Sequence, residues 1–140
     1  MKNLLFAVSL IALISVQVYS QGKIISKKSA NELFGPVLVS KEVPTENLKM
    51  NLNQSTNVVM FKIMNNDIYI LNNNRDVLSP LGTTVSSSDV FSVYSISIVQ
   101  ELLNSGGSSV TYVEKRKEVL TITNGEYTLE YSIACPPVCP

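Results

Sequence analysis

The cysteines Cys135 and Cys139 offer the most specific chemistry in the chain, and they lie in the segment Cys135-Pro136-Pro137-Val138-Cys139-Pro140. In an oxidising compartment, two cysteines without a third indicate a disulfide first. An extended Pro-Pro segment would hold the two Cα atoms about 12 Å apart, whereas a disulfide needs roughly 4.4–6.8 Å. A turn at Pro136, or a cis bond between the prolines, would close this gap. We expect a disulfide, with metal or redox use, intermolecular pairing and free thiols as alternatives.

The same six residues resemble the C-x-x-x-C-P copper motif of the Sco family of copper chaperones. Members of that family hold the metal with two thiolates and a distant histidine on a thioredoxin-like fold. The resemblance implies that Cys135 and Cys139 are two sulfur ligands, which as soft thiolates would suit Cu(I). It covers only these six residues, and the chain has no histidine to complete the ligand set.

The absence of histidine also limits catalysis, because histidine is the usual general base near neutral pH. A serine or cysteine triad of the ordinary kind is excluded. Ser26-Lys27 and Ser40-Lys41 contain the residue types of a Ser-Lys dyad. Adjacent residues of a strand point to opposite faces, so neither pair is favoured.

Paired carboxylates are the remaining catalytic possibility, since glycosidases use two of them at a fixed separation. Glu126 and Glu130 lie roughly 13 Å apart along a strand, too far for that chemistry. Glu114, Glu118 and Glu130 would become neighbours if the last strands form a meander. We favour a solvated strand face there and keep a carboxylate-dependent hydrolase as a distant third hypothesis.

The first twenty residues have the pattern of a cleavable signal peptide. Lys2 precedes an apolar stretch over residues 4–16, and Val18 and Ser20 are small enough to direct cleavage before Gln21. The stretch is shorter than the ~20 residues of a spanning helix, so we expect no stable membrane anchor after cleavage. The sequence thus predicts a signal peptide over 1–20, one domain over 21–134 and a Cys/Pro tail over 135–140.

The charge of the exported chain is close to balanced. Removal of Lys2 leaves ten basic residues against eleven acidic ones, and the only dense basic run, over residues 115–117, is flanked by Glu114 and Glu118. Nucleic-acid binding needs a basic stripe, so we do not expect that partner. No cofactor motif is present, because Gly106-Gly107 follows a predicted helix and does not open one.

Alternation and turn residues predict the first strands. Leu48, Met50 and Leu52 alternate with polar residues, which predicts a half-buried strand over 47–53. An Asn65-Asn66 turn would pair Met64 with Asp67 and Phe61 with Ile70 in a hairpin. Both faces of this hairpin are largely apolar, which indicates a central position covered on both sides.

Helical spacing is seen at two places. Ser29 and Gly35 would bound a single helical turn. After a strand over residues 90–94, Ser95 or Ser97 would cap a helix with a stripe of Ile98, Val99, Leu102 and Leu103 that ends at Gly106-Gly107. A continuous strand over 90–103 is the alternative, and we favour the helix because the apolar residues recur at 3.6-residue spacing.

The last hairpin is predicted from Asn124-Gly125, the preferred pair for a type I′ turn. This turn would pair Ile122 with Tyr127 and Leu120 with Leu129. The other face of the hairpin carries threonine and glutamate and is expected to be wet. A preceding strand over 110–114 would join through the charged residues 115–117. Five tyrosines are expected mainly to pack the core: Tyr69, Tyr94, Tyr112, Tyr127 and Tyr131.

Together these patterns predict a fold that is α+β or mainly β. We expect a single antiparallel β-rich domain of about seven strands, with hairpins, a C-terminal meander and one short helix. The leading function is a secreted or periplasmic, non-enzymatic binding or structural module for an unknown protein or small ligand. The alternative is a thiol-based copper or redox accessory protein that uses Cys135 and Cys139.

Overall fold

The computed structural model describes residues 22–130 and 133–135, so the predicted signal peptide lies outside the described residues. The strands are β1 (Lys23–Ser26), β2 (Val39–Pro44), β3 (Val58–Met64), β4 (Asp67–Leu71), β5 (Val77–Ser79), β6 (Phe91–Ser95), β7 (Val110–Lys115), β8 (Leu120–Asn124), β9 (Tyr127–Glu130) and β10 (Ile133–Cys135). The helices of this part of the chain are α1 (Lys27–Phe34), α2 (Thr45–Leu52) and α3 (Ile96–Gly106).

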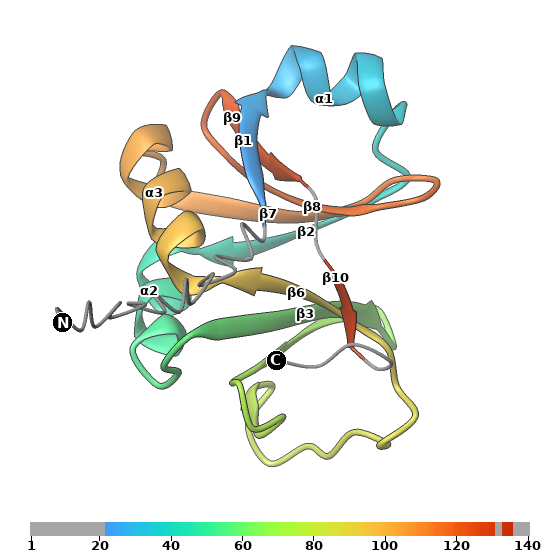
Figure 1. The fold of residues 1–140 in the computed structure, drawn as a ribbon, viewed down its shortest axis with the longest axis vertical. Helices are drawn as coiled ribbons and strands as arrows, with labels where there is room; N and C mark the ends of the chain where they lie inside the picture. Colours follow the sequence, from blue (N-terminus) through green and yellow to red (C-terminus); the bar gives the residue numbers. More distant parts are fainter. Residues whose placement is uncertain (1–21, 131–132, 136–140) are drawn as a thin grey trace, which may run out of the picture.

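The strands of the described residues form two antiparallel sheets that lie face to face (Figure 1). Sheet A has the strand order β1-β9-β8-β7-β2, and sheet B has the order β10-β6-β3-β4-β5. Helices α2 and α3 lie together at one end of the sheets, whereas α1 packs against β1 and β9 of sheet A. The predicted fold class, an antiparallel β-rich α+β domain, is confirmed.

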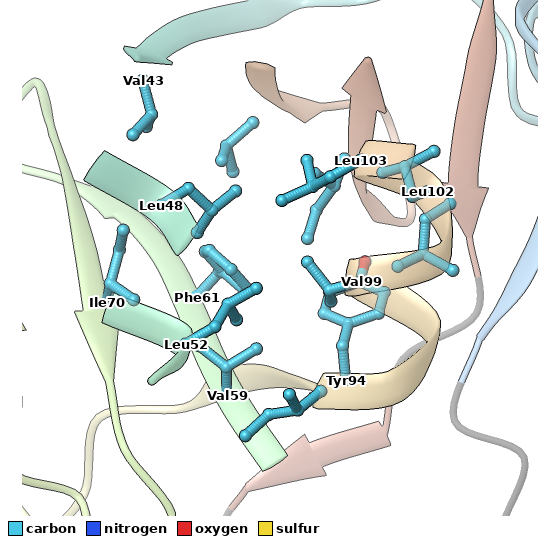
Figure 2. Close-up of a cluster of buried hydrophobic side chains, with 14 of the residues drawn as sticks. Val43, Leu48, Leu52, Val59, Phe61, Ile70, Tyr94, Val99, Leu102 and Leu103 are labelled. Atoms are coloured by element: carbon cyan, nitrogen blue, oxygen red, sulfur yellow. The ribbon is translucent and has the colours of Figure 1, made fainter. Parts of the chain in front are cut away.

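The main core lies between the sheets, where α2 and α3 close one end of it (Figure 2). Phe61 of β3 and Tyr94 of β6, both in sheet B, pack edge to face, with ring centroids 6.0 Å apart and ring planes at 68°. Burial of each large apolar side chain contributes about 1.5–3 kcal/mol. The buried members are Val43, Leu48, Leu52, Val59, Phe61, Ile68, Ile70, Leu78, Tyr94, Ile96, Val99, Leu102, Leu103, Val113, Ile122 and Leu129.

The β3–β4 hairpin has the predicted register. Met64 pairs with Asp67 and Phe61 with Ile70, and the turn residues Asn65 and Asn66 have φ angles of 52° and 61°. Both positive angles are those of a type I′ turn, which asparagine tolerates well. Both faces of the hairpin are buried as predicted, because alternate residues enter the main core or a second apolar cluster, made of Val58, Met60, Tyr69, Leu71, Phe91 and Val93.

Helix α3 also follows the prediction, and the alternative of a continuous strand is wrong. The hydroxyl of Ser95 caps the helix by accepting from the backbone N–H of Ile98, and Gly107 ends it with a left-handed φ of 63°. Val99, Leu102 and Leu103 form the buried stripe. Because the Ser95 cap and the glycine at Gly107 are local signals, both ends of this helix could be predicted from the sequence.

Two helical segments differ from the prediction. The segment predicted as a strand over 47–53 lies mostly in helix α2. Leu48 and Leu52 are spaced by four residues and are both buried, whereas the intervening Met50 is 64% exposed. Leu48 and Leu52 lie on the same face of α2, and Met50 is an exposed apolar residue between them. In the sequence, these three residues look like the alternation of a strand. Helix α1 is longer than the single turn predicted, because it is capped by Ser26 before it ends at Gly35.

The last hairpin turns one residue later than predicted. Asn124 pairs with Tyr127 and Ile122 with Leu129, so Gly125 and Glu126 are the turn residues. Of these two, only Gly125 has a positive φ, 58°, as in a type II′ turn. Asn124 stays in β8 because its side-chain amide is buried and donates to the Thr111 hydroxyl at 2.9 Å and to the Ser108 carbonyl at 3.0 Å.

Candidate functional site

The predicted cysteine site is only partly within the described residues. Cys135 ends β10, where its backbone pairs with Phe91 of β6 at the edge of sheet B. Cys139 lies outside the described residues. In the described ranges, no three histidine, cysteine, aspartate or glutamate side chains gather in a way that would hold a metal ion. The disulfide and copper predictions for Cys135 and Cys139 therefore stay predictions.

The glutamates of the final meander lie in different surroundings. Glu114 is only 5% exposed, and it faces Arg116 and threonines rather than another carboxylate. Glu130 lies two strands away in β9, at roughly 10 Å by strand spacing. Glu118 and Glu126 are exposed in the connections that follow β7 and β8. Glu114 is paired with Arg116 and Thr123, and the carboxylate-dependent hydrolase stays a prediction.

The expectation of a wet face on this hairpin is wrong. Thr121, Thr123 and Thr128 are no more than 1% exposed, and Arg116 is fully buried. The Arg116 guanidinium donates to Oδ1 of Asn31 at 2.7 Å and to the carbonyl of Gly35 at 2.5 Å, both in the α1 region. Helix α1 therefore covers a polar sheet face that sequence alternation alone could only assign to solvent.

This buried polar cluster, defined as Glu114, Arg116, Thr121, Thr123 and Asn31, is internally paired. Arg116 Nη2 lies 3.4 Å from Glu114 Oε2, and Thr123 Oγ1 donates to the same oxygen at 2.8 Å. Arg116 Nε donates to Thr121 Oγ1 at 3.2 Å. Because buried charges are tolerated only when paired and hydrogen-bonded, the cluster serves to fasten α1 to sheet A.

The two candidate Ser-Lys dyads are also used structurally. Ser26 Oγ accepts from the backbone N–H of Ser29 at 3.0 Å and caps α1. Lys41 Nζ donates to Asn66 Oδ1 at 2.6 Å, which links sheet A to the β3–β4 turn of sheet B. In the described residues, neither lysine makes a hydrogen bond to its neighbouring serine, so these contacts do not support a Ser-Lys dyad.

A cavity of about 240 Å³ lies at the end of the sandwich away from α2 and α3, between sheet B and the β7–β8 connection. We call it the inter-sheet pocket. Its apolar lining comes from both sheets and from the adjoining connections: Phe61, Ile63, Val90, Val119 and Leu120. Its polar lining is Ser92 together with Lys62, Lys115, Arg116, Lys117 and Glu118. We call the apolar side chains of the lining its floor and the polar, mostly cationic ones its rim.

The cations of this rim differ in what they contact. Lys62 Nζ lies 2.7 Å from Asp89 Oδ1, and the hydrogen bond from Lys62 lowers the pKa of the Asp89 carboxyl below its ordinary value. The guanidinium of Arg116 is committed to the buried polar cluster. Within the described ranges, Lys115 and Lys117 have neither a salt bridge nor a side-chain hydrogen bond. These two ammonium groups are the positive charges of the lining that are available to a ligand.

A second cavity of about 370 Å³ lies between α2 and α3. Its lining is largely polar, with Asn53, Gln100 and Asn104, and its one cation, Lys49, is paired with Glu46 at 2.8 Å. This cavity is larger, but apart from Leu52 and Leu103 its lining is polar, and its one cation already has a partner. We therefore regard the inter-sheet pocket as the candidate site.

Sequence reasoning did not find the inter-sheet pocket. The run over 115–117 was noted only as a short basic run and a charged turn, and nothing in the sequence places it against Ile63 and Ser92 of the other sheet. The tyrosines gave a mixed outcome: Tyr69 and Tyr94 are buried, whereas Tyr112 and Tyr127 are 36% and 43% exposed. Tyr131 lies outside the described residues.

Comparisons with protein-family models, with curated proteins and with solved structures found no match to this chain. No helix within residues 22–130 is both long enough and apolar enough to cross a membrane. The case for function therefore depends on the geometry of the inter-sheet pocket and on the chemistry of the side chains around it.

Proposed function

We propose that this protein is an exported, non-enzymatic binding module that takes a small ligand into the inter-sheet pocket. The observation that carries the proposal is a cavity of about 240 Å³ in which apolar side chains lie beside two lysines without partners in the described residues. Small-molecule sites typically combine apolar walls with a few polar groups. The signal-like segment over 1–20 supports export, and the lack of histidine favours binding over catalysis.

The walls of the inter-sheet pocket are held in place before any ligand arrives. The phenol of Tyr94, in β6, donates a hydrogen bond to the carbonyl of Leu120, in β8, and so ties the two sheets together beside the pocket. The β7–β8 connection is closed by a hydrogen bond from the backbone N–H of Arg116 to the carbonyl of Val119 at 2.9 Å. A preformed site loses less free energy to ordering when it binds, which favours affinity.

The buried polar cluster supports the same site from the other side. Arg116 lies between Lys115 and Lys117, and its side chain is anchored under α1 by Asn31 and Gly35. The anchor fixes the backbone from which the two lysines extend. We infer that the cluster positions the rim of the pocket, in addition to fastening α1.

The test is a ligand screen with two matched variants, in which leucine replaces a small polar residue in each cavity. Ser92→Leu fills part of the inter-sheet pocket, and Asn104→Leu fills part of the cavity between α2 and α3. A library of small anionic, neutral and cationic fragments would be screened by saturation-transfer NMR against the protein and both variants, after thermal melts have verified folding.

The proposal predicts fragments whose signal is lost with Ser92→Leu and kept with Asn104→Leu. If hits are lost with Asn104→Leu instead, the site is misplaced. A screen that yields no hits on the unmodified protein contradicts a small-ligand function for this pocket.

A further inference from the structure

We propose that the ligand of the inter-sheet pocket is a compact organic carboxylate with an apolar or aromatic body, bound through Lys115 and Lys117. This inference rests on the proposed function and specifies its ligand. The carboxylate would lie at the rim between the two ammonium groups, and the body would lie against Ile63, Val90 and Leu120.

The charge balance of the lining favours an anion. Lys62 is offset by Asp89, and Arg116 is offset by Glu114. The remaining charges of the lining are Lys115 and Lys117 against the single carboxylate of Glu118. An amine would therefore meet a net positive rim, whereas a carboxylate would give both lysines the charge-assisted hydrogen bonds that they lack in the described residues.

The position of Lys115 brings this charge next to the apolar floor. Lys115 is the last residue of β7 and pairs with Leu120 in β8. It shares the inward face of β7 with Val113, which is fully buried in the main core. The aliphatic part of a lysine commonly packs on apolar surface while its ammonium group stays in water. A ligand that contacts Leu120 is thus within reach of the Lys115 ammonium group.

The size of the pocket limits the body of the ligand. A volume of about 240 Å³ is below the range of roughly 300–1,000 Å³ that is typical of pockets for drug-sized molecules. Inorganic phosphate would use the lysines but leave the apolar lining uncovered. A long-chain fatty acid would exceed the space. A phenyl or short branched carboxylate matches both the volume and the lining.

The test uses tryptophan as a reporter, because the chain contains none. Val90 belongs to the apolar lining and is 49% exposed, so Val90→Trp places a single indole in the pocket. Leu81→Trp is the matched control, since Leu81 is 84% exposed and is not part of the lining. The probes are phenylacetate, neutral phenylacetamide, cationic phenethylamine and inorganic phosphate. Calorimetric titration of the unmodified protein verifies that the reporter has not altered the site.

We expect phenylacetate to change the emission of Val90→Trp in a saturable way and to leave Leu81→Trp unchanged. Neutralising either rim lysine, as Lys115→Gln or Lys117→Gln, should weaken the binding of phenylacetate about two- to fivefold, within the range that exposed charge pairs contribute. Lys28→Gln is the control, because Lys28 is an exposed lysine on α1 outside the lining. Raising the salt concentration should weaken binding by screening the same charges.

The carboxylate inference is overturned if phenylacetamide or phenethylamine binds as tightly as phenylacetate, or if both lysine variants keep full affinity. It is also overturned if phenylacetate fails to bind at millimolar concentration. In these cases the proposed function still stands when other fragments are lost with Ser92→Leu. The proposed function itself fails only when the fragment screen also finds no ligand for the inter-sheet pocket.

Discussion

Replacement of Arg116 by methionine should destabilise the protein strongly, although Arg116 belongs to a run of charges that looks like an exposed turn. The side chain of Arg116 is fully buried and Glu114 is 5% exposed. Arg116→Met would leave the Glu114 carboxylate without its counter-charge. It would also remove the donors to Asn31 Oδ1 and to the carbonyl of Gly35.

The magnitude follows from these lost partners. Removing one member of a buried ion pair typically costs about 3–5 kcal/mol. Because Thr123 Oγ1 still donates to the carboxylate at 2.8 Å, we expect the lower part of that range, about 3–4 kcal/mol. For a domain of this size, about 4 °C per kcal/mol gives a decrease in Tm of about 12–16 °C.

The assay is urea unfolding followed by circular dichroism, arranged as a double-mutant cycle. The single variants are Arg116→Met and Glu114→Gln, and the double variant carries both. Since the double variant buries no unpaired charge, its loss of stability should be at least about 1 kcal/mol smaller than the sum of the two single losses. Lys117→Met is the control, because an exposed residue of the same connection should change stability by no more than about 0.5 kcal/mol.

This reasoning is refuted if Arg116→Met costs less than about 1 kcal/mol, or if the two single effects add in the double variant. Amide hydrogen exchange gives an independent check. Loss of the arginine should reduce protection in α1, since Asn31 and Gly35 are the contacts through which Arg116 holds that region.

Three further predictions concern stability. Gly106→Ala should lower the free energy of unfolding by about 3 kcal/mol in urea titrations, because an added Cβ would lie 2.3 Å from the backbone oxygen of Asn124. Asp89→Asn should destabilise the fold at neutral pH, since the hydrogen bond from Lys62 lowers the Asp89 pKa and stabilises the charged form. This difference should shrink in melts below the ordinary pKa of 3.8, as the native carboxyl becomes protonated. Burial raises the pKa of Glu130, so its charged form costs stability, and Glu130→Gln should raise Tm at pH 7 but not below pH 4.5.

The elements predicted correctly were those fixed by short-range signals. Asn65 and Asn66 tolerate the positive φ angles of a type I′ turn, so the register of the β3–β4 hairpin followed from two residues. Ser95 and Gly107 bound α3 in the same local way. Each of these signals acts within a few residues and does not depend on the rest of the fold.

The errors arose where distant residues decided the outcome. Asn124-Gly125 has the sequence of a type I′ turn, but the Asn124 amide bonds instead to Thr111 and Ser108, more than ten residues away. The spacing of Leu48 and Leu52 suggests a strand in the sequence. In the structure they belong to helix α2, which packs against α3 and buries both side chains in the main core. Local propensity cannot predict such tertiary contacts.

The candidate site was missed for the same physical reason. A run of Lys115, Arg116 and Lys117 reads as solvated charge, and only the position of α1 reveals that the middle residue is buried. The pocket itself requires two sheets to face one another, with Ile63 from one and Leu120 from the other. Neither the burial of Arg116 nor the packing of the two sheets can be predicted from the spacing of residues along the chain.

The central claim is that the inter-sheet pocket is where this protein binds its ligand. Amide chemical-shift mapping of the fragment hits on the isotopically labelled protein tests this claim most directly. The account predicts that the shifted amides cluster at Ile63, Ser92 and the β7–β8 connection, around the lining of the pocket. Shifts that cluster instead at Gln100 and Asn104, in the cavity between α2 and α3, would contradict it.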